Sequence, residues 1–152
     1  MSDERLLIPQ DPEYFQAVGL AAIAFARLEW NAAWCCERLK PNYIGTIETK
    51  KKTAGTIAKD LKILFSRVAD QTLRTKIAPF AEQFELLVIE RNGLLHGKPA
   101  TSKNNEQRLF RGGDEWTIAA INDFADQCVI AGRPLNALLY NEMSDGSVID
   151  LH

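Results

Sequence analysis

The sequence predicts an all-α fold, an antiparallel bundle of four to five helices with a small β-hairpin or irregular loop before the last long helix. Apolar residues recur at the helical spacing of three and four over most of the 152 residues. The connections between these segments are mostly short, which places successive helices antiparallel. Turn residues replace the helical pattern in one long stretch, Pro99 to Thr117.

Length and composition predict one helical domain over residues 1–152. Apolar residues make up 46% of the chain and charged residues 25%, as in an average soluble domain. The net charge of −2 excludes a protein that coats nucleic acid through charge alone, so any RNA contact requires a local basic patch. No GxGxxG motif and no GK[ST] phosphate loop occurs, and nothing in the pattern predicts a parallel sheet.

The chain is expected to be cytoplasmic, with no membrane association. Its longest apolar run, Val18 to Ala26, has nine residues, whereas a membrane span needs about 20. The first residues carry mixed charge and no signal-peptide core. Three cysteines without a second closely spaced pair argue against a disulfide framework or a zinc site, and buried free thiols are expected. We expect neither a metal nor another cofactor.

The first helix is expected from about Glu13 to Leu39, with Pro12 near its start and Pro41 just past its end. Its main stripe keeps the spacing of three and four and consists of Val18, Ala22, Phe25, Leu28, Ala32, Cys36 and Leu39. A second stripe lies off that face and consists of Ile23, Trp30 and Trp34. A helix that is apolar on two sides is buried on two sides, and the second side can meet another subunit.

After a connector from Pro41 to Lys52, Thr53 or Thr56 can cap a second helix. Its apolar stripe is Ile57, Leu61, Leu64 and Val68. A third helix is expected from about Leu73 to His96, with Pro79 marking a late start or a kink. Its core-facing residues are Ile77, Phe80, Phe84, Leu87 and Val88. Gly97 and Pro99 then end it.

The irregular stretch predicts a short hairpin that pairs Ala100–Lys103 with Gln107–Arg111. The last helix is expected to start near Thr117. Pro134, which follows Gly132 and Arg133, should kink this helix or split it in two. The polar tail after Met143 is expected to fray.

Candidate catalytic residues lie together where the third helix ends, in the segment from Glu90 to Gly97. His96 is one of only two histidines in the chain. From Arg91 to Gly113 there are five basic residues and one acidic residue, a local charge of +4 in a chain of net −2. Arg91 and His96 are five positions apart, which is about 140° around a regular helix. They converge only if the helix loosens near Gly93, if its last turn is distorted, or across a subunit interface.

The residues Arg91, Asn92 and His96 resemble the RxxxxH motif of HEPN domains (higher eukaryotes and prokaryotes nucleotide-binding), in which a polar residue often follows the arginine. The resemblance implies a four- or five-helix bundle and a metal-independent endoribonuclease, often a toxin or a defence effector, that acts as a homodimer. By position, Arg91 and His96 would be the catalytic pair and Asn92 an orienting residue. A subgroup paired with a nucleotidyltransferase antitoxin has tyrosine where this chain has Lys98, which argues against that particular partner.

The chemistry of RNA cleavage suits these residue types. A base that removes the proton of a 2′-hydroxyl lets its oxygen attack the adjacent phosphorus, and histidine titrates in the right range. Arginine stays charged and can stabilise the additional negative charge of the transition state. Two copies of one histidine in a symmetric dimer would supply both base and acid. Lys98, Lys103 and Arg111 would position RNA phosphates without reading sequence.

Simpler interpretations stay open for the two motif residues. His96 can cap a helix through its favourable interaction with the helix dipole. Arg91 can pair with Glu90 or Glu85, or remain solvated. The corresponding function is a catalytically silent HEPN-like module that binds a nucleotide, an RNA or a protein partner such as an antitoxin; a helical adaptor without a ligand is a third interpretation.

Three further features have two interpretations each. Glu29 can hold Arg91 in place across the bundle, although a surface glutamate is the commoner case. Trp30 and Trp34 can stack on RNA bases, but tryptophans at helical spacing more often lie in a core or a dimer interface. The lysine run 50–52 can touch phosphate or form a solvated charged face.

Overall fold

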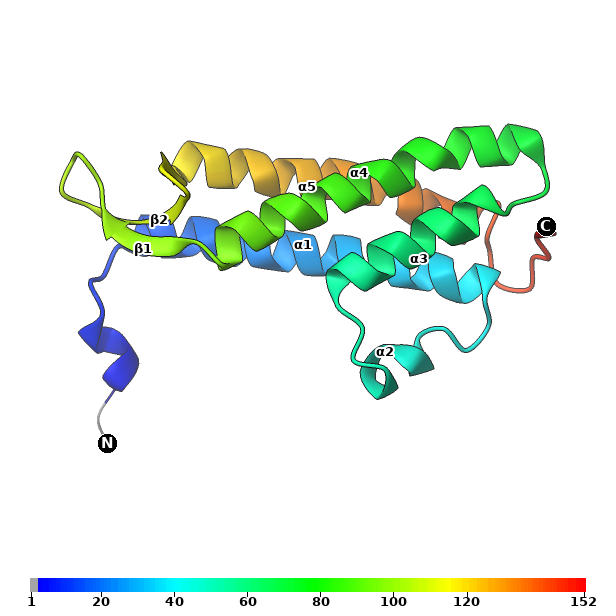
Figure 1. Cartoon of the computed structure of the whole chain (residues 1–152), viewed down its shortest axis with the longest axis horizontal. Coiled ribbons are helices and arrows are strands. Elements are labelled where there is room, and N and C mark those ends of the chain that lie inside the picture. The colour runs from blue at the N-terminus through cyan, green and yellow to red at the C-terminus, as the bar shows by residue number, and fades with distance from the viewer. Residues whose placement is uncertain (1–2) are drawn as a thin grey trace.

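The computed structural model describes residues 3–152, and most of these residues are helical. Figure 1 shows α1 (Pro12–Leu39), α4 (Gln71–Leu95) and α5 (Ile118–Tyr140) side by side along the long axis of the molecule. The shorter α3 (Ala54–Ser66) covers one half of that layer. The remaining elements are η1 (Glu4–Leu7), α2 (Gly45–Thr49), β1 (Lys98–Thr101), β2 (Gln107–Arg111) and β3 (Asp114–Glu115).

The all-α prediction was too strict, because a three-stranded antiparallel sheet precedes the last helix. Strand β1 pairs with β2 in the register Lys98↔Phe110 to Thr101↔Gln107, so the predicted hairpin exists but its first strand begins two residues before Ala100. The third strand, β3, was missed because two residues carry no alternating pattern. It pairs with the end of β2 through the turn at Gly112, whose φ is +60°.

Four helices begin at a side chain that accepts a hydrogen bond from a backbone N–H of the first turn. The capping residues are Asp11, Thr53, Asp70 and Thr117. The structure therefore selects Thr53 over Thr56 as the cap of α3, and the predicted start of α5 at Thr117 is confirmed. Helix α4 begins at Gln71 rather than Leu73, because the Asp70 carboxylate already accepts from the Leu73 N–H.

The core forms where the buried faces of α1, α4 and α5 meet. The ring of Phe25 on α1 lies 6.2 Å from that of Phe84 on α4 and 6.4 Å from that of Phe124 on α5, measured between centroids. Offset aromatic pairs at this separation add to the free energy gained by burying their area. The opposite side of α1 is exposed, because Ile23 and Trp30 retain 62% and 51% of their accessible surface.

A kink of α5 at Pro134 stays a prediction, whereas the predicted split of this helix and the predicted fraying of the tail were wrong. Helix α5 is not split, because it continues from Ile118 to Tyr140 with Pro134 inside it, and Leu135 and Leu138 beyond the proline remain buried in the core. The tail after Met143 is packed rather than frayed. Met143 is fully buried, and residues 151 and 152 pair with the backbone of residues 67 and 68 after α3. A proline costs one helical hydrogen bond, and the burial of the following turn offsets that cost.

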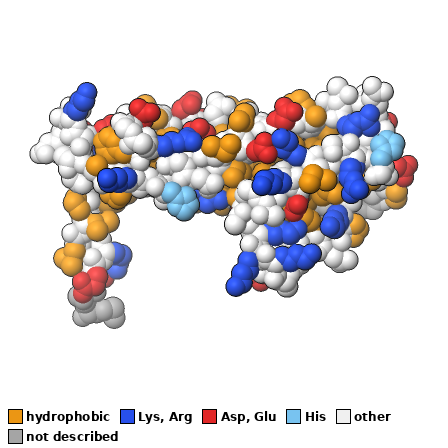
Figure 2. All heavy atoms as spheres, viewed as in Figure 1, with side chains coloured by type: hydrophobic (Ala, Val, Ile, Leu, Met, Phe, Trp, Pro, Cys, Tyr) orange, Lys and Arg blue, Asp and Glu red, His pale blue; other side chains and the backbone are white. Residues whose placement is uncertain are grey.

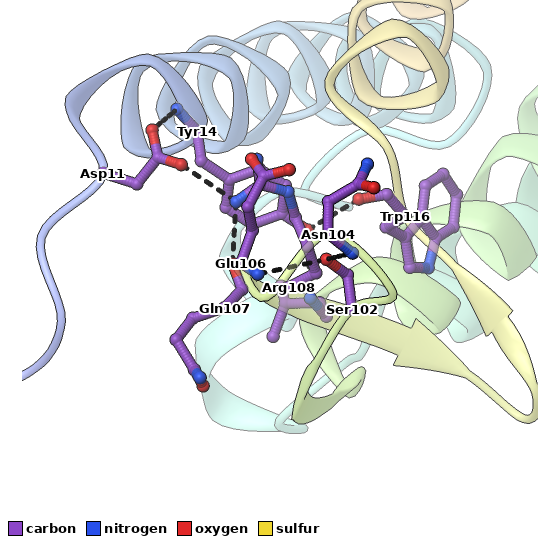
Figure 3. Close-up of polar contacts among 9 residues, drawn as sticks. Asp11, Tyr14, Ser102, Asn104, Glu106, Gln107, Arg108 and Trp116 are labelled. Atoms are coloured by element: carbon purple, nitrogen blue, oxygen red, sulfur yellow. Dashed lines mark hydrogen bonds and ion pairs between the residues drawn. The ribbon is translucent and has the colours of Figure 1, made fainter.

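A polar cluster ties the sheet to the start of α1 (Figure 3). The Tyr14 hydroxyl donates to the carbonyl oxygen of Trp116 at 2.8 Å and accepts from the N–H of Leu109 at 3.0 Å. The Arg108 guanidinium lies 4.5 Å above the Tyr14 ring. It also donates to Asp11 at 2.9 Å and to Glu106. The sheet therefore has a fixed position at one end of the helices, next to the end of α4.

Replacing Tyr14 by phenylalanine should destabilise the protein without removing the buried ring. The change leaves the Leu109 N–H and the Trp116 carbonyl without this partner, which costs about 1–3 kcal/mol in the free energy of unfolding. Tyr140→Phe is the matched control, because Tyr140 is 77% exposed and should change the free energy by less than about 0.5 kcal/mol. Urea denaturation measures both. Equal effects of the two substitutions would show that the hydrogen bonds of the Tyr14 hydroxyl do not stabilise the fold.

Candidate functional site

Arg91 lies in the last turns of α4, with its side chain against α1. Its guanidinium carbon is 4.7 Å from the centroid of the Phe25 ring, a cation–π distance. Its Nε is buried and has no hydrogen-bond partner. Within residues 3–152, the Arg91 side chain forms no hydrogen bond or ion pair. The structure thus places this cation over the Phe25 ring and leaves its donors uncommitted.

Glu29 of α1 interacts electrostatically with Arg91. It follows Phe25 by one helical turn and is half-buried. Burial raises the pKa of the Glu29 carboxyl above its ordinary value, and the nearby positive charge of Arg91 lowers it in part. Glu29 is the residue that the sequence offers as a support for Arg91, and the two charges are close enough to influence each other.

His96 follows α4 directly and its side chain is exposed. Its backbone N–H donates to the Asn92 carbonyl at 3.0 Å, which completes the last turn, and the Asn92 side chain is exposed as well. Helix α4 stays regular through Gly93 up to Leu95, so Arg91 and His96 keep the separation around the helix that regular geometry dictates. Within residues 3–152, no hydrogen bond joins their side chains.

Gly93 makes room for Arg111 of β2. A Cβ atom at this position would lie 2.8 Å from the Cδ of Arg111, whose guanidinium donates to Glu90 at 3.1 Å. The Gly93 carbonyl accepts a hydrogen bond of 3.1 Å from the indole N–H of Trp116. The last turns of α4 are therefore fastened to the sheet from two directions. Nothing in the sequence pattern singled out Trp116 for this role.

The basic residues between His96 and Gly113 form two groups, the arginines that pair with carboxylates and the exposed lysines. Arg108 is 7% exposed and its charge is matched by Asp11 and Glu106, so it is structural. Arg111 is exposed and paired with Glu90. Lys98 begins β1, Lys103 lies in the turn after it, and both side chains are exposed. Figure 2 shows Lys and Arg side chains gathered over the half of the molecule that carries α2 and α3, and acidic and basic side chains mixed over the rest of the visible face.

The three cysteines are buried and free, as the sequence predicts. Burial raises the pKa of Cys36 and of Cys128 to about 12 and that of Cys35 further still. These thiols are therefore protonated at neutral pH and are poor nucleophiles. Residues 3–152 contain no group of three or more His, Cys, Asp or Glu side chains that could hold a metal ion. None of the helices in that range is long and apolar enough to span a bilayer.

Comparisons with family models, with curated proteins and with solved structures gave no match for this chain. The resemblance to HEPN domains therefore rests on the residues of the motif and on the helical architecture that carries it.

Glu29→Gln should change the pH dependence of stability. Because burial raises the pKa of Glu29 in the folded state, the folded chain binds the proton more tightly than the unfolded chain. Ionisation of the Glu29 carboxyl therefore lowers the free energy of unfolding of the wild type as pH rises through the folded-state pKa. Below the unfolded-state pKa the carboxyl is protonated in both states and has no such effect. Urea unfolding at pH 4 and pH 7 should show the substitution to be more favourable at pH 7. The opposite trend would mean that attraction to Arg91 outweighs burial.

Proposed function

We propose that this chain is a metal-independent endoribonuclease of the HEPN type that acts as a homodimer, as a toxin or as a stress or phage-defence effector in the cytoplasm. The observation that supports the proposal most strongly is the state of Arg91. Its guanidinium is half-buried, held over the Phe25 ring, and its donors are uncommitted next to a turn that ends in an exposed histidine. A phosphodiester supplies the acceptor oxygens that such an arginine lacks.

In the proposed reaction, His96 removes the proton of a ribose 2′-hydroxyl. The freed oxygen attacks the adjacent phosphorus, and the 5′-oxygen of the next nucleotide leaves with a proton from a second acid. The products are a 2′,3′-cyclic phosphate and a 5′-hydroxyl. Arg91 stabilises the charge on the phosphorane oxygens, a contribution that is strong at a site with little water. Asn92, exposed one turn before His96, orients the substrate or the histidine.

A dimer can bring an Arg91 and a His96 together, although the two residues point in different directions around α4 within one chain. In a symmetric pair, the His96 side chain of one subunit faces the Arg91 guanidinium of the other, and the second histidine supplies the acid. Helix α4 offers a surface for such a contact, since the apolar side chains of Leu86 and Ile89, which are neighbours on one face of the helix, are 57% and 49% exposed. Apolar side chains exposed on one helix are typical of interaction surfaces.

The exposed cations beside the motif would hold the RNA backbone. Lys98 follows His96 by two residues, and Arg111 lies across Gly93. Lys103 sits at the tip of the β1–β2 hairpin, so it would contact a phosphate farther along the strand. Contacts of this kind set the register of the substrate and give little sequence preference.

A catalytically silent module that binds a nucleotide, an RNA or a protein partner such as an antitoxin is the second candidate. Two observations favour it. Within residues 3–152 no side-chain hydrogen bond joins Arg91 and His96, and carboxylates already neutralise Arg108 and Arg111. In that case Arg91 would bind a phosphate or a carboxylate of the partner without any reaction.

His96→Ala should reduce RNA cleavage at least 100-fold, because removing a general base costs two to four orders of magnitude in rate. The assay is cleavage of a mixed RNA pool in EDTA, with the new ends identified by mass. His152→Ala is the matched control, since it removes the other histidine of the chain, which is also exposed, and should leave the rate unchanged. Cleavage of a strand that lacks 2′-hydroxyls, or full activity of His96→Ala, would overturn the mechanism.

The solution mass of the wild type should be twice the 17.0 kDa of one chain. Ile89→Glu places a charge on the exposed apolar surface of α4 and should yield a folded monomer with no nuclease activity. Ile63→Glu on α3, at a site of similar exposure, is the control and should stay dimeric. Analytical ultracentrifugation measures the mass and circular dichroism verifies the fold. A monomeric wild type that still cleaves RNA would refute the proposal that two subunits together form the catalytic site.

A further inference from the structure

A second candidate site lies in a groove between α1 and α5. The groove has a volume of about 410 Å³, within the range of small-molecule sites. Buried Leu28 and Cys128 form part of its apolar lining. The polar and aromatic side chains along it are Arg27, Trp30 and Asn31 from α1, and Arg133 and Asn136 from α5.

The groove is separate from the end of α4. Arg27 and Asn31 are each two positions from Glu29, which interacts with Arg91, so they lie about 200° away around α1. The two sites therefore occupy opposite sides of the same helix. A ligand in the groove would touch neither Arg91 nor His96.

The electrostatics of the groove favour an anion. Arg27 and Arg133 both line it, and no acidic residue does. Among residues 3–152, neither guanidinium takes part in an ion pair, although the chain as a whole carries a net charge of −2. Two exposed arginines in one groove match the oxygens of a phosphate group.

Trp30 adds a surface for a flat ring. It is 51% exposed, and within residues 3–152 its indole forms no aromatic pair and no cation–π contact. Trp34, one turn farther along α1, differs because the Arg38 guanidinium lies 5.5 Å from its ring. A half-exposed indole beside free cations is suited to stacking on a nucleobase.

The two asparagines supply hydrogen-bonding groups that can read a base edge. The Asn31 amide nitrogen donates to the Gly132 carbonyl at 3.4 Å, which leaves its side-chain oxygen as an acceptor. The exposed Asn136 amide has both its donor and its acceptor available.

We propose that the α1–α5 groove binds a nucleotide, with the base stacked on Trp30 and the phosphate bound by Arg27 and Arg133. The ligand is either a free nucleoside monophosphate or one unit of a single-stranded RNA. This proposal does not rest on the nuclease proposed above, because none of its residues belongs to the Arg91–His96 site.

The test is calorimetric titration of the His96→Ala chain, which leaves RNA uncut. The probes are adenosine monophosphate, adenosine, inorganic phosphate and a short oligoadenylate. Arg133→Gln and Trp30→Ala should each weaken nucleotide binding about tenfold, since one stacked base or one charged contact is worth that much. Trp30→Tyr should restore most of the loss. Arg67→Gln, at an exposed arginine outside the groove, is the matched control and should have no effect.

Two outcomes support the proposal and identify the source of the ligand. Binding of the monophosphate that depends on Arg133 and Trp30 indicates a free nucleotide, and binding of the oligoadenylate alone with the same dependence indicates an RNA strand. Three outcomes overturn it: no binding of either probe, binding that the groove substitutions leave unchanged, or binding of inorganic phosphate as tight as that of the nucleotide.

Discussion

The packing of α1 against α4 and α5 through the ring of Phe25 is the contact on which the rest of the structure depends. This ring forms an aromatic cluster with Phe84 and Phe124, and the guanidinium of Arg91 lies over it as well. The same side chain therefore sets the spacing of three helices and the place of the arginine. A buried ring also excludes water from one side of the guanidinium, which strengthens its attraction for an anion on the other.

The sheet provides the second constraint. Tyr14, Asp11 and Arg108 fix β2 to the start of α1, and Trp116 extends the connection to the Gly93 carbonyl in the last turns of α4. The exposed end of α4 is consequently held from both sides, although it lies at the edge of the molecule. A site on rigid elements places its groups more accurately than one on a free loop.

Periodicity was sufficient to predict the long helices, because their buried faces repeat every three to four residues. It failed where contacts between distant residues decide the outcome. Arg108 contributes to the local charge of +4 that the sequence shows, but its partner Asp11 lies 97 residues earlier in the chain. The polar tail was expected to fray, but Met143 and Leu151 pack onto the bundle. The helix position of Arg91 was predictable, whereas its contact with Phe25 required the fold.

The central claim is that the end of α4 binds RNA through His96, and nuclear magnetic resonance tests it directly. The chain has two histidines, so the imidazole spectrum contains one signal from the site and one internal reference, His152. A single-stranded oligonucleotide without 2′-hydroxyls is added, because it binds but cannot be cleaved. We predict that the His96 signal shifts on addition of the oligonucleotide, while the His152 signal stays unchanged. An unchanged His96 signal at saturating oligonucleotide would contradict it.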